Sequence, residues 1–513
     1  MLQQEVLYCH GLQGWLACLE HDGVPASELG LTLNRRIIEG ADRLLVFDQA
    51  QLDALQSANP GAWLPPAAVL RGEGGVDIDT YRAAIASAID ASQRHTLSNL
   101  ADALAGTSPG DDQLQAIAAH AASNWRLRKQ PRLLIDVTQL ARSDLGSGIQ
   151  RVVRNIASEI LRMASPGQPV ELVRQHEGKL WRAPGVVASL FGVPADSLQA
   201  LEVTVQPGDT LLMIDSSWEQ YADFAPVFQA VRQLGGRIVT VVYDLIPLQL
   251  PHTCIPALVR VFESWFPLAV QHSDMLLCIS GAVADEVRAY IAKHQLPMPR
   301  QLEVTHWPLG ADLTVRSSES AVRDEVRRML EDTANTASPL FLMVGTLEPR
   351  KGHAFALQAF EQLWQQGSTA RVCMAGSIGW LDAHTLDHIR THPELGKRLF
   401  FIERFTDAEI NLCYAAATGL IAASVAEGFG LPIVEAALHR VPALASDIPV
   451  FREVGGAGAR YFSLEHPGHL AQAVTEFAAM PAEQRLEMAA QIPTVTWKQS
   501  ARALLDVIGI QSP

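Results

Sequence analysis

Two glutamates, Glu427 and Glu435, enclose the segment EGFGLPIVE, and their carboxylates could bind hydroxyl groups. An apolar run, Gly419–Ser424, precedes this segment and an apolar helical pattern, Ile433–Leu438, follows it, which predicts a strand, a glycine turn and a helix. Glycines let the backbone approach a ligand, and a helix start offers free N–H groups and a positive dipole end to phosphate. The combination predicts a sugar-nucleotide site; a surface helix start with two solvated glutamates is the alternative.

A basic pair, Arg350 and Lys351, lies in the segment GTLEPRKG, directly after the apolar run Leu340–Val344. Ligands of open parallel sheets bind at the carboxyl ends of strands, so this position predicts that the two cations reach a cleft. There they could stabilise the charge that grows on a departing diphosphate. Gly345 and Thr346 would allow close backbone approach, whereas a solvated loop is the alternative for the basic pair.

Another glycine loop, formed by Gly146, Ser147 and Gly148, opens a predicted helix after the apolar run Leu133–Val137. A loop at a helix start is a candidate site for an anion or an acceptor. Its pattern is not G-x-G-x-x-G, so dinucleotide binding fits poorly. A plain junction between loop and helix explains Ser147 equally well.

The bulk composition narrows the class of protein. A length of 513 residues accommodates two or three domains, and 48% hydrophobic residues can fill their cores. The net charge of −15 argues against a nucleic-acid partner. The six cysteines form no C-x-x-C pair and are expected to be reduced residues of a cytoplasmic protein. Neither a signal peptide at Met1–Val6 nor an apolar run of about 18 residues is recognised.

Apolar runs and helical patterns alternate from Pro131 onward, which predicts a doubly wound α/β architecture with two Rossmann-like units. Between the units we expect a helix at Ala321–Met329 and a loop at Glu331–Ser338. In the first unit we also expect a loop at Thr138–Gly148 and a helix at Ile149–Arg162. The other predicted strands are Thr210–Ile214, Arg237–Val242, Met275–Ile279, Arg371–Ala375, Leu399–Ile402, Gly419–Ala423 and Ala443–Ala445.

The first 128 residues contain a candidate internal repeat. Ala41–Leu55 aligns without a gap to Ser273–Val287, 232 residues further on, and Gly75–Asp77 parallels Gly310–Asp312. The segment is therefore interpreted as an N-terminal extension that contains part of another module. Chance similarity of two strand–helix segments is the alternative.

EGFGLPIVE closely resembles the E-x7-E motif of retaining glycosyltransferases of the GT-B fold, family 4, and the basic pair stands where that family has one. The resemblance covers about Pro131–Pro513. It implies two Rossmann-like domains facing a cleft. The expected boundaries are 1–128 for the extension, 129–318 for the acceptor domain, 319–493 for the nucleotide-sugar domain and 494–513 for a helix that crosses back to the acceptor domain.

The resemblance also implies roles for individual residues. Glu435 would bind the donor ribose, Glu427 would contact sugar hydroxyls near the reacting carbon, and Arg350 with Lys351 would hold the diphosphate. The turn that completes the donor site comprises Gly428, Phe429, Gly430 and Leu431. The reaction would occur on one face of the sugar, with no glutamate as covalent nucleophile and without a metal ion or cofactor.

Tyr243 and Asp244 follow the predicted strand Arg237–Val242. The family commonly has His-Asp here, so Tyr243 is a departure, although a tyrosine can still donate a hydrogen bond. Tyr243 is grouped with Gly146, Ser147 and Gly148 as a candidate acceptor or phosphate contact. Asp244 fits the pattern and either positions the acceptor or caps a helix.

GIQRVVR, YDLIPLQLPH and TVTWKQSARALLDV look most like bacterial mannosyl- and rhamnosyltransferases. We therefore expect transfer of mannose, or a 6-deoxyhexose such as rhamnose, from a nucleotide sugar, GDP-linked by preference, to a glycan or lipid-linked glycan in O-antigen or related synthesis. Peripheral association with the inner membrane and contact with other glycosyltransferases of the pathway stay open. The alternatives are a non-catalytic glycan- or nucleotide-binding GT-B module, or another GT-B enzyme such as an epimerase or glucan synthase.

Overall fold

The computed structural model describes residues 131–144, 146–164, 169–192, 200–299, 301–311, 322–336 and 338–510, together with four short strands nearer the N-terminus. These strands form a sheet in the order β1-β2-β3-β4. They are β1 (Val6–Leu7), β2 (Trp15–Cys18), β3 (Ala41–Val46) and β4 (Ala67–Val69).

The candidate repeat aligns residues 43–46 of β3 with β11 (Met275–Cys278). Both strands have parallel neighbours on either side. Gly75–Asp77 lies outside the described residues, so the repeat stays a prediction.

The first large sheet has eight strands in the order β12-β11-β10-β9-β5-β6-β7-β8. Among its central parallel strands, β5, β9 and β11 are fully buried, as their apolar runs predict, whereas β7 and β8 pair antiparallel at one edge. The antiparallel edge was not predicted from the sequence. The strands are β5 (Leu133–Asp136), β6 (Val170–His176), β7 (Lys179–Arg182), β8 (Glu202–Val203), β9 (Thr210–Met213), β10 (Arg237–Val242), β11 and β12 (Glu303–His306).

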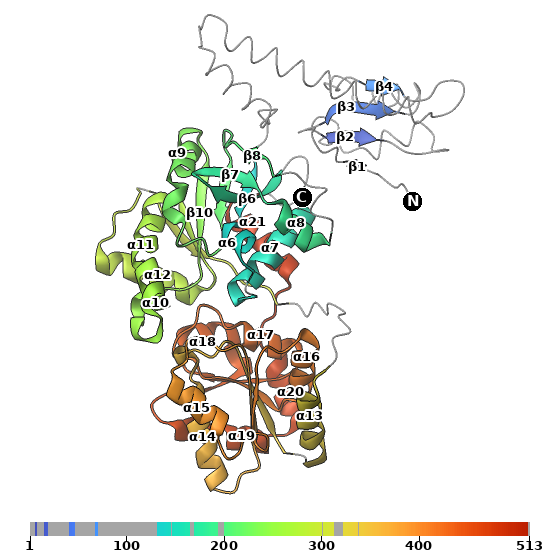
Figure 1. Cartoon of the computed structure of the whole chain (residues 1–513), viewed down its shortest axis with the longest axis vertical. Helices are drawn as coiled ribbons and strands as arrows, with labels where there is room; N and C mark the ends of the chain where they lie inside the picture. Colours follow the sequence, from blue (N-terminus) through green and yellow to red (C-terminus); the bar gives the residue numbers. More distant parts are fainter. Residues whose placement is uncertain are drawn as a thin grey trace, which may run out of the picture.

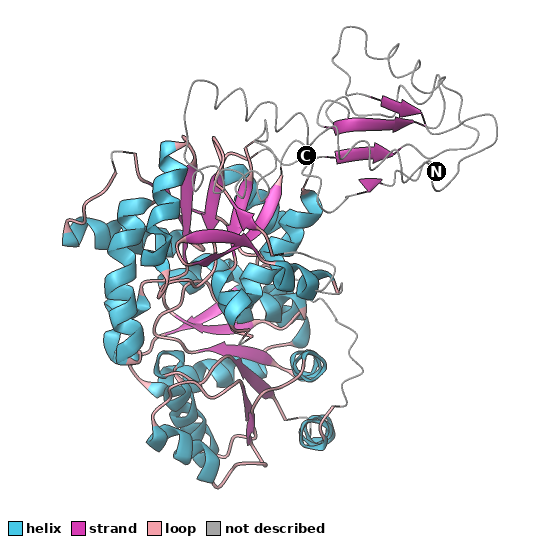
Figure 2. Cartoon of the chain, turned by 45° about the horizontal axis from the view of Figure 1, so that its top comes forward, coloured by secondary structure: helices cyan, strands magenta, loops and turns pink. Residues whose placement is uncertain are grey.

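Helices lie on both faces of this sheet and enclose two apolar cores, one against each face (Figure 2). They are α6 (Thr138–Arg142), α7 (Gly148–Met163), α8 (Pro184–Phe191), α9 (Ala225–Gln233), α10 (Ile246–Gln249), α11 (Pro256–His272) and α12 (Gly281–His294). The prediction of a loop over Thr138–Gly148 is wrong for its first five residues, which form the short helix α6. Its backbone is held by Asp215, whose carboxylate accepts the Leu140 N–H over 2.6 Å.

The second large sheet has six parallel strands in the order β15-β14-β13-β16-β17-β18. The strands are β13 (Leu340–Val344), β14 (Arg371–Ala375), β15 (Leu399–Ile402), β16 (Gly419–Ala422), β17 (Ala443–Ser446) and β18 (Ala459–Phe462). Its helices are α13 (Asp324–Thr336), α14 (His353–Gln365), α15 (Ala383–Thr391), α16 (Asp407–Ala416), α17 (Leu431–Leu438), α18 (Pro449–Gly455), α19 (Pro467–Ala479) and α20 (Ala482–Ala490).

The predicted break between helix and loop before β13 is wrong, because α13 continues to Thr336 through the segment expected as a loop. Acidic residues in its first turn, Asp324 and Glu325, suit the positive end of a helix. The polar EDTANT sequence is therefore part of a helix rather than a linker.

The last helix, α21 (Trp497–Val507), packs on α7 in the first domain (Figure 1). Trp497, Leu504 and Leu505 are buried in that core. A Cβ on Gly310 would lie 2.6 Å from the Trp497 backbone, so glycine permits the close crossing of the two segments. The chain thus returns to the first domain after it completes the second.

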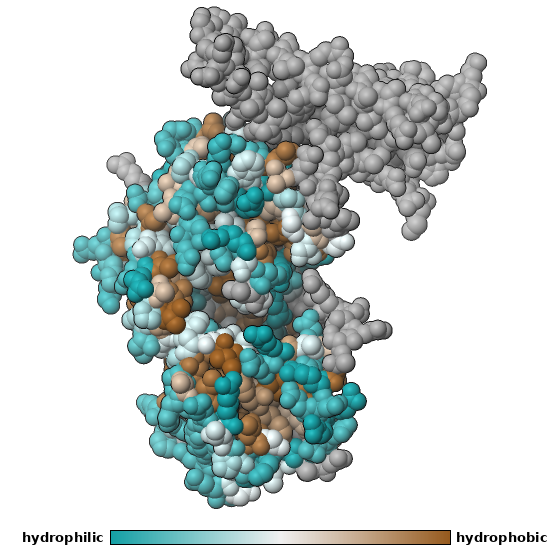
Figure 3. Space-filling view, in the orientation of Figure 1, coloured by the Kyte–Doolittle hydropathy of each residue, from teal (hydrophilic) through white to brown (hydrophobic). Residues whose placement is uncertain are grey.

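Strand order reverses at one point in each large sheet, between β5 and β9 in the first and between β13 and β16 in the second. Loops at the carboxyl ends of the strands diverge at such a point and leave room for a ligand. The surface is indented where the two domains meet (Figure 3).

Candidate active site between the two domains

Arg350 and Lys351 lie in a 3-10 turn, Pro349–Lys351, shortly after β13. The turn ends at Gly352, whose φ is 71° and whose added Cβ would lie 2.2 Å from the Ala423 carbonyl oxygen. Glycine is therefore required for the turn to pack against the end of β16. The Val425 N–H donates to the Arg350 carbonyl over 2.8 Å and fixes the two loops together.

The Glu427 carboxylate, only 10% exposed, receives both cations. Arg350 Nη1 lies 2.8 Å from Oε2, Lys351 Nζ lies 2.5 Å from Oε1, and the Ser424 hydroxyl donates to Oε1 over 2.7 Å. Burial alone would raise the pKa of Glu427, but the two cations and the hydrogen bonds bring it down to about 2. At neutral pH this residue is an ionised acceptor and no proton donor.

Three further groups surround this network. Glu348 Oε2 lies 2.8 Å from Arg350 Nε. Asp244 approaches from the first domain; burial raises its pKa, whereas the charge of Arg350 lowers it. Burial and the nearby Lys351 lower the pKa of His353 to about 4, so this imidazole is neutral at physiological pH. The structure therefore gathers all four predicted catalytic residues, three from the second domain and Asp244 from the first.

Glu435 lies on α17, buried apart from 9% of its side chain. Its Oε2 accepts the Tyr414 hydroxyl over 3.1 Å. Its Oε1 accepts Arg151 Nη1, from the first turn of α7 in the other domain, over 2.5 Å. The predicted ribose ligand therefore already has a cationic partner across the cleft, which the sequence analysis did not name.

The turn of the E-x7-E segment contacts both domains. A Cβ on Gly428 would lie 2.1 Å from the Tyr243 carbonyl oxygen, and the Ser280 hydroxyl donates to the Gly428 carbonyl over 2.8 Å. Phe429 packs against the cores of both domains. Gly430 adopts a left-handed conformation, φ 101°, as the residue before α17, and Leu431 begins that helix.

The loop residues Gly345 and Thr346 continue from β13, and the Gly345 N–H donates to the Ala375 carbonyl over 3.0 Å. The Lys351 side chain lies 3.6 Å from the position of a Cβ on Gly345. A cavity at the reversal point of this sheet is lined by Lys351, Ser424 and Glu427, among others.

The acceptor loop is exposed, and its serine has a structural partner. Ser147 caps α7 by accepting the Gln150 N–H, and the Gln150 side chain completes a capping box. Gly146 has a φ of 64°, and a Cβ on Gly148 would meet nothing within 4 Å. The loop begins the helix that carries Arg151.

The expectation that Tyr243 donates into the cleft is wrong for its hydroxyl. Tyr243 is 4% exposed within the first core, and its hydroxyl donates to the Ile214 carbonyl over 2.7 Å. Its backbone carbonyl is what faces Gly428. Asp244 does not occupy the N-cap position of α10, which is Leu245, although its carboxylate accepts the Ile246 N–H over 3.0 Å.

A buried acid pair, Asp136 and Asp215, lies at the reversal point of the first sheet and was also not named from the sequence. Asp136 accepts the hydroxyls of Thr138 and Ser217. Burial and the charge of Asp215 raise the pKa of Asp136 to about 7. The available signal was an aspartate that ends the apolar run LLID.

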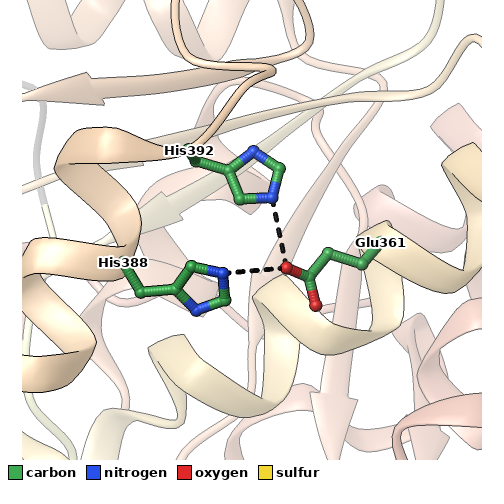
Figure 4. A group of neighbouring side chains, drawn as sticks. All are labelled: Glu361, His388 and His392. Carbon is green, nitrogen blue, oxygen red and sulfur yellow. Dashed lines mark hydrogen bonds and ion pairs between the residues drawn. The ribbon is translucent and has the colours of Figure 1, made fainter.

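One group of potential metal ligands, Glu361, His388 and His392, occurs among the described residues (Figure 4). Both imidazole Nε2 atoms lie 3.1 Å from Glu361 Oε1. The Glu394 N–H donates to His392 Nδ1 over 3.1 Å, so the hydrogen of a neutral His392 lies on Nε2. That nitrogen then donates to Glu361 and has no lone pair for a metal. The arrangement therefore favours a hydrogen-bonded cluster of these three side chains over a metal site.

Residues 328–494 match the family described as glycosyl transferases group 1. Over 396 residues the chain is 36% identical to the serotype-specific mannosyltransferase WbdA of Escherichia coli, a match that covers 76% of this chain and 48% of WbdA. The O-antigen chain mannosyltransferase RfbU of Salmonella typhimurium is 30% identical over 142 residues, 28% of this chain and 39% of RfbU. The chain spans about half the length of the WbdA relatives that it matches.

The fold is similar to sucrose-phosphate synthase of Thermosynechococcus elongatus, with a TM-score of 0.51, 16% identity, and coverage of 74% of this chain and 98% of that one. The predicted GT-B fold, two Rossmann-like domains on either side of a cleft, is thereby confirmed. Among the helices that the structure describes, none has the length and apolar character needed to cross a membrane.

Proposed function

We propose that this protein is a retaining hexosyltransferase of family 4, because residues 328–494 match the glycosyl transferases group 1 family. Its donor is a nucleotide sugar, GDP-mannose by preference and a nucleotide-linked 6-deoxyhexose otherwise. Its acceptor is a glycan or lipid-linked glycan of a bacterial surface polysaccharide such as O-antigen. The mannosyltransferase names of its relatives support the choice of sugar.

The observation that carries the proposal is the convergence of Arg350 and Lys351 on Glu427 at the reversal point of the second sheet. Two fixed cations at a strand end can stabilise the charge of a departing diphosphate, the role that a divalent metal has in metal-dependent transferases. We therefore propose a metal-independent reaction.

The ionised state of Glu427 supports the role that we assign to it. With a pKa of about 2 it can accept hydrogen bonds from sugar hydroxyls but cannot protonate a leaving group near pH 7. Its carboxylate is also shared between two cations and a hydroxyl, which weakens it as a nucleophile. We infer transfer on one face of the sugar, with a leaving-phosphate oxygen taking the acceptor proton.

The reaction would take place on the cytoplasmic side of the inner membrane, where the chain could associate with other glycosyltransferases of the pathway. Asp244, which faces the network from the first domain, would position the acceptor hydroxyl. Burial raises the pKa of this carboxyl group, whereas the charge of Arg350 lowers it.

The test is thermal stabilisation by GDP, UDP, dTDP and ADP, each with and without EDTA, followed by transfer from the matching nucleotide sugar. A ligand of the folded state raises the melting temperature. We expect a shift with GDP that EDTA does not change, and its loss in Arg350→Ala. A matched control is Arg460→Ala, because Arg460 is an exposed arginine paired with Glu476 elsewhere on the same domain. No shift with any diphosphate would refute the donor site and favour a non-catalytic module.

A further inference from the structure

Several hydrogen bonds link the two domains across the cleft. The Ser280 hydroxyl donates to the Gly428 carbonyl, the N–H groups of Gly281 and Ala282 donate to Glu453, and the Trp380 indole donates to the Thr253 carbonyl, each over 2.8 Å. Another link is the ion pair of Arg151 with Glu435. It differs from the others because the proposed function assigns Glu435 to the donor ribose.

Arg151 occupies an unusual place for a cation. It lies in the first turn of α7, where the helix dipole is positive and disfavours a positive side chain. The next arginine on that helix, Arg154, pairs with Asp144 inside the first domain. Arg151 instead reaches Glu435 in the second domain, and 41% of its side chain stays exposed. Its position is therefore explained by the contact across the cleft and not by its own helix.

Both oxygens of the Glu435 carboxylate already have a donor, and Arg151 covers the side of it that faces the cleft. Tyr414 donates to Oε2 and Arg151 donates to Oε1, and the carboxylate is almost wholly buried. A ribose offers two neighbouring hydroxyl donors, and a carboxylate binds such a pair through both oxygens. The half-exposed Arg151 is the partner that can leave, because Tyr414 is 1% exposed and fixed in the core.

We propose that Arg151 is a positioning residue that the donor displaces: it holds Glu435 when the donor site is empty and is released into the cleft when ribose binds. This inference rests on the proposed function. The ion pair and the ribose compete for Oε1, so Arg151 weakens nucleotide binding. Once released, its guanidinium lies at the start of α7 beside the acceptor loop, and its charge becomes available to the reactants only after the donor has bound.

The test compares GDP with 2′,3′-dideoxy-GDP by calorimetry on the wild type, Arg151→Gln and Arg154→Gln. We expect Arg151→Gln to bind GDP about tenfold more tightly, about 1.4 kcal/mol, because the competing ion pair is gone. The gain should vanish with the dideoxy nucleotide, which lacks both hydroxyls. Arg154→Gln, one turn along the same helix, should behave as the wild type. We also expect Arg151→Gln to lower kcat, since the released cation is missing.

The outcomes separate the two proposals. If GDP does not bind to the wild type, the donor site itself is refuted. If GDP binds to the wild type but no more tightly to Arg151→Gln, or if dideoxy-GDP gains equally, the displacement of Arg151 is refuted and the donor site stands. Arg151→Lys provides a second variant that keeps the charge but loses the planar guanidinium; we expect a smaller gain than for Arg151→Gln.

Discussion

Replacing Gly428 with alanine would test whether the two domains must meet at the E-x7-E turn. The Cβ would lie 2.1 Å from the Tyr243 carbonyl oxygen and 3.1 Å from the Ile279 side chain, both in the first domain. Gly428 is not among the residues with positive φ, so alanine can adopt its backbone conformation. The conflict is therefore between domains and not within one.

The size of the effect follows from the distances. The Cβ and the Tyr243 oxygen must separate by about 0.9 Å to reach 3.0 Å, the shortest distance that real Cβ atoms show. The same displacement would lengthen the hydrogen bond between Ser280 and Gly428 from 2.8 Å to about 3.7 Å, beyond hydrogen-bonding range. A misplacement of about 1 Å in a catalytic site can cost about 100-fold in rate.

We expect Gly428→Ala to lower kcat/KM for sugar transfer about 100-fold. GDP binding should change much less, because most donor contacts lie within the second domain. Small-angle scattering should show a larger radius of gyration for the variant. The control is Gly185→Ala on α8, where a Cβ meets nothing within 4 Å. Unchanged kcat/KM, or loss of folded protein, would refute the reasoning, since the clash lies only between the domains.

Three further predictions concern single residues. Lys351→Ala should lower the single-turnover rate tenfold to a thousandfold, roughly the cost of removing one transition-state donor, and an unchanged rate would exclude this role. The pKa of Asp136 is about 7 in the folded protein and 3.8 without the effects of the fold. The folded protein therefore keeps a proton that the unfolded chain loses, so the contribution of Asp136 to stability falls as pH rises from about 4 to about 7. Asp136→Asn should therefore be more stable than the wild type by about 2 to 4 kcal/mol at pH 8 and gain nothing at pH 4; denaturant midpoints with equal pH dependence would contradict this. Tyr243→Phe removes the hydrogen bond to the Ile214 carbonyl and should lower the free energy of unfolding by about 1 to 3 kcal/mol. GDP affinity should stay the same; weaker GDP binding would indicate that the Tyr243 hydroxyl contacts the donor.

The sequence predicted the most buried strands of both large sheets because such strands have continuous apolar runs, such as Leu340–Val344. It missed β6, β7, β8, β12 and β18. It also predicted that Arg350 and Lys351 reach a cleft from a strand end, whereas their ion pairs with Glu427 were not predicted. The antiparallel edge was missed because β8 has only two residues and no periodicity to detect. The helix at Asp324–Thr336 was cut short because its polar surface looks like a loop in the sequence.

Side-chain direction was harder to predict than position. Tyr243 follows a strand end, which predicted a side chain in the cleft, but its ring fills the first core and its hydroxyl is used by Ile214. Arg151 closely follows the glycine loop Gly146–Gly148 in the sequence, yet its partner, Glu435, is 284 residues further along the chain. No local pattern can reveal a partner at that separation, because it depends on how two separately folded domains approach.

In the structure, the glycines of the E-x7-E segment allow a contact between the two domains. They were interpreted as room for a ligand, but the space at Gly428 is filled by the Tyr243 carbonyl of the first domain. The Ser280 hydroxyl binds the Gly428 carbonyl, and Phe429 packs into both cores. The turn therefore connects Glu427 and Glu435, the two proposed donor ligands, to the position of the first domain. The placement of the two carboxylates thus depends on the contact between the domains, which is why the Gly428 and Arg151 variants should alter catalysis more than they alter the stability of either domain.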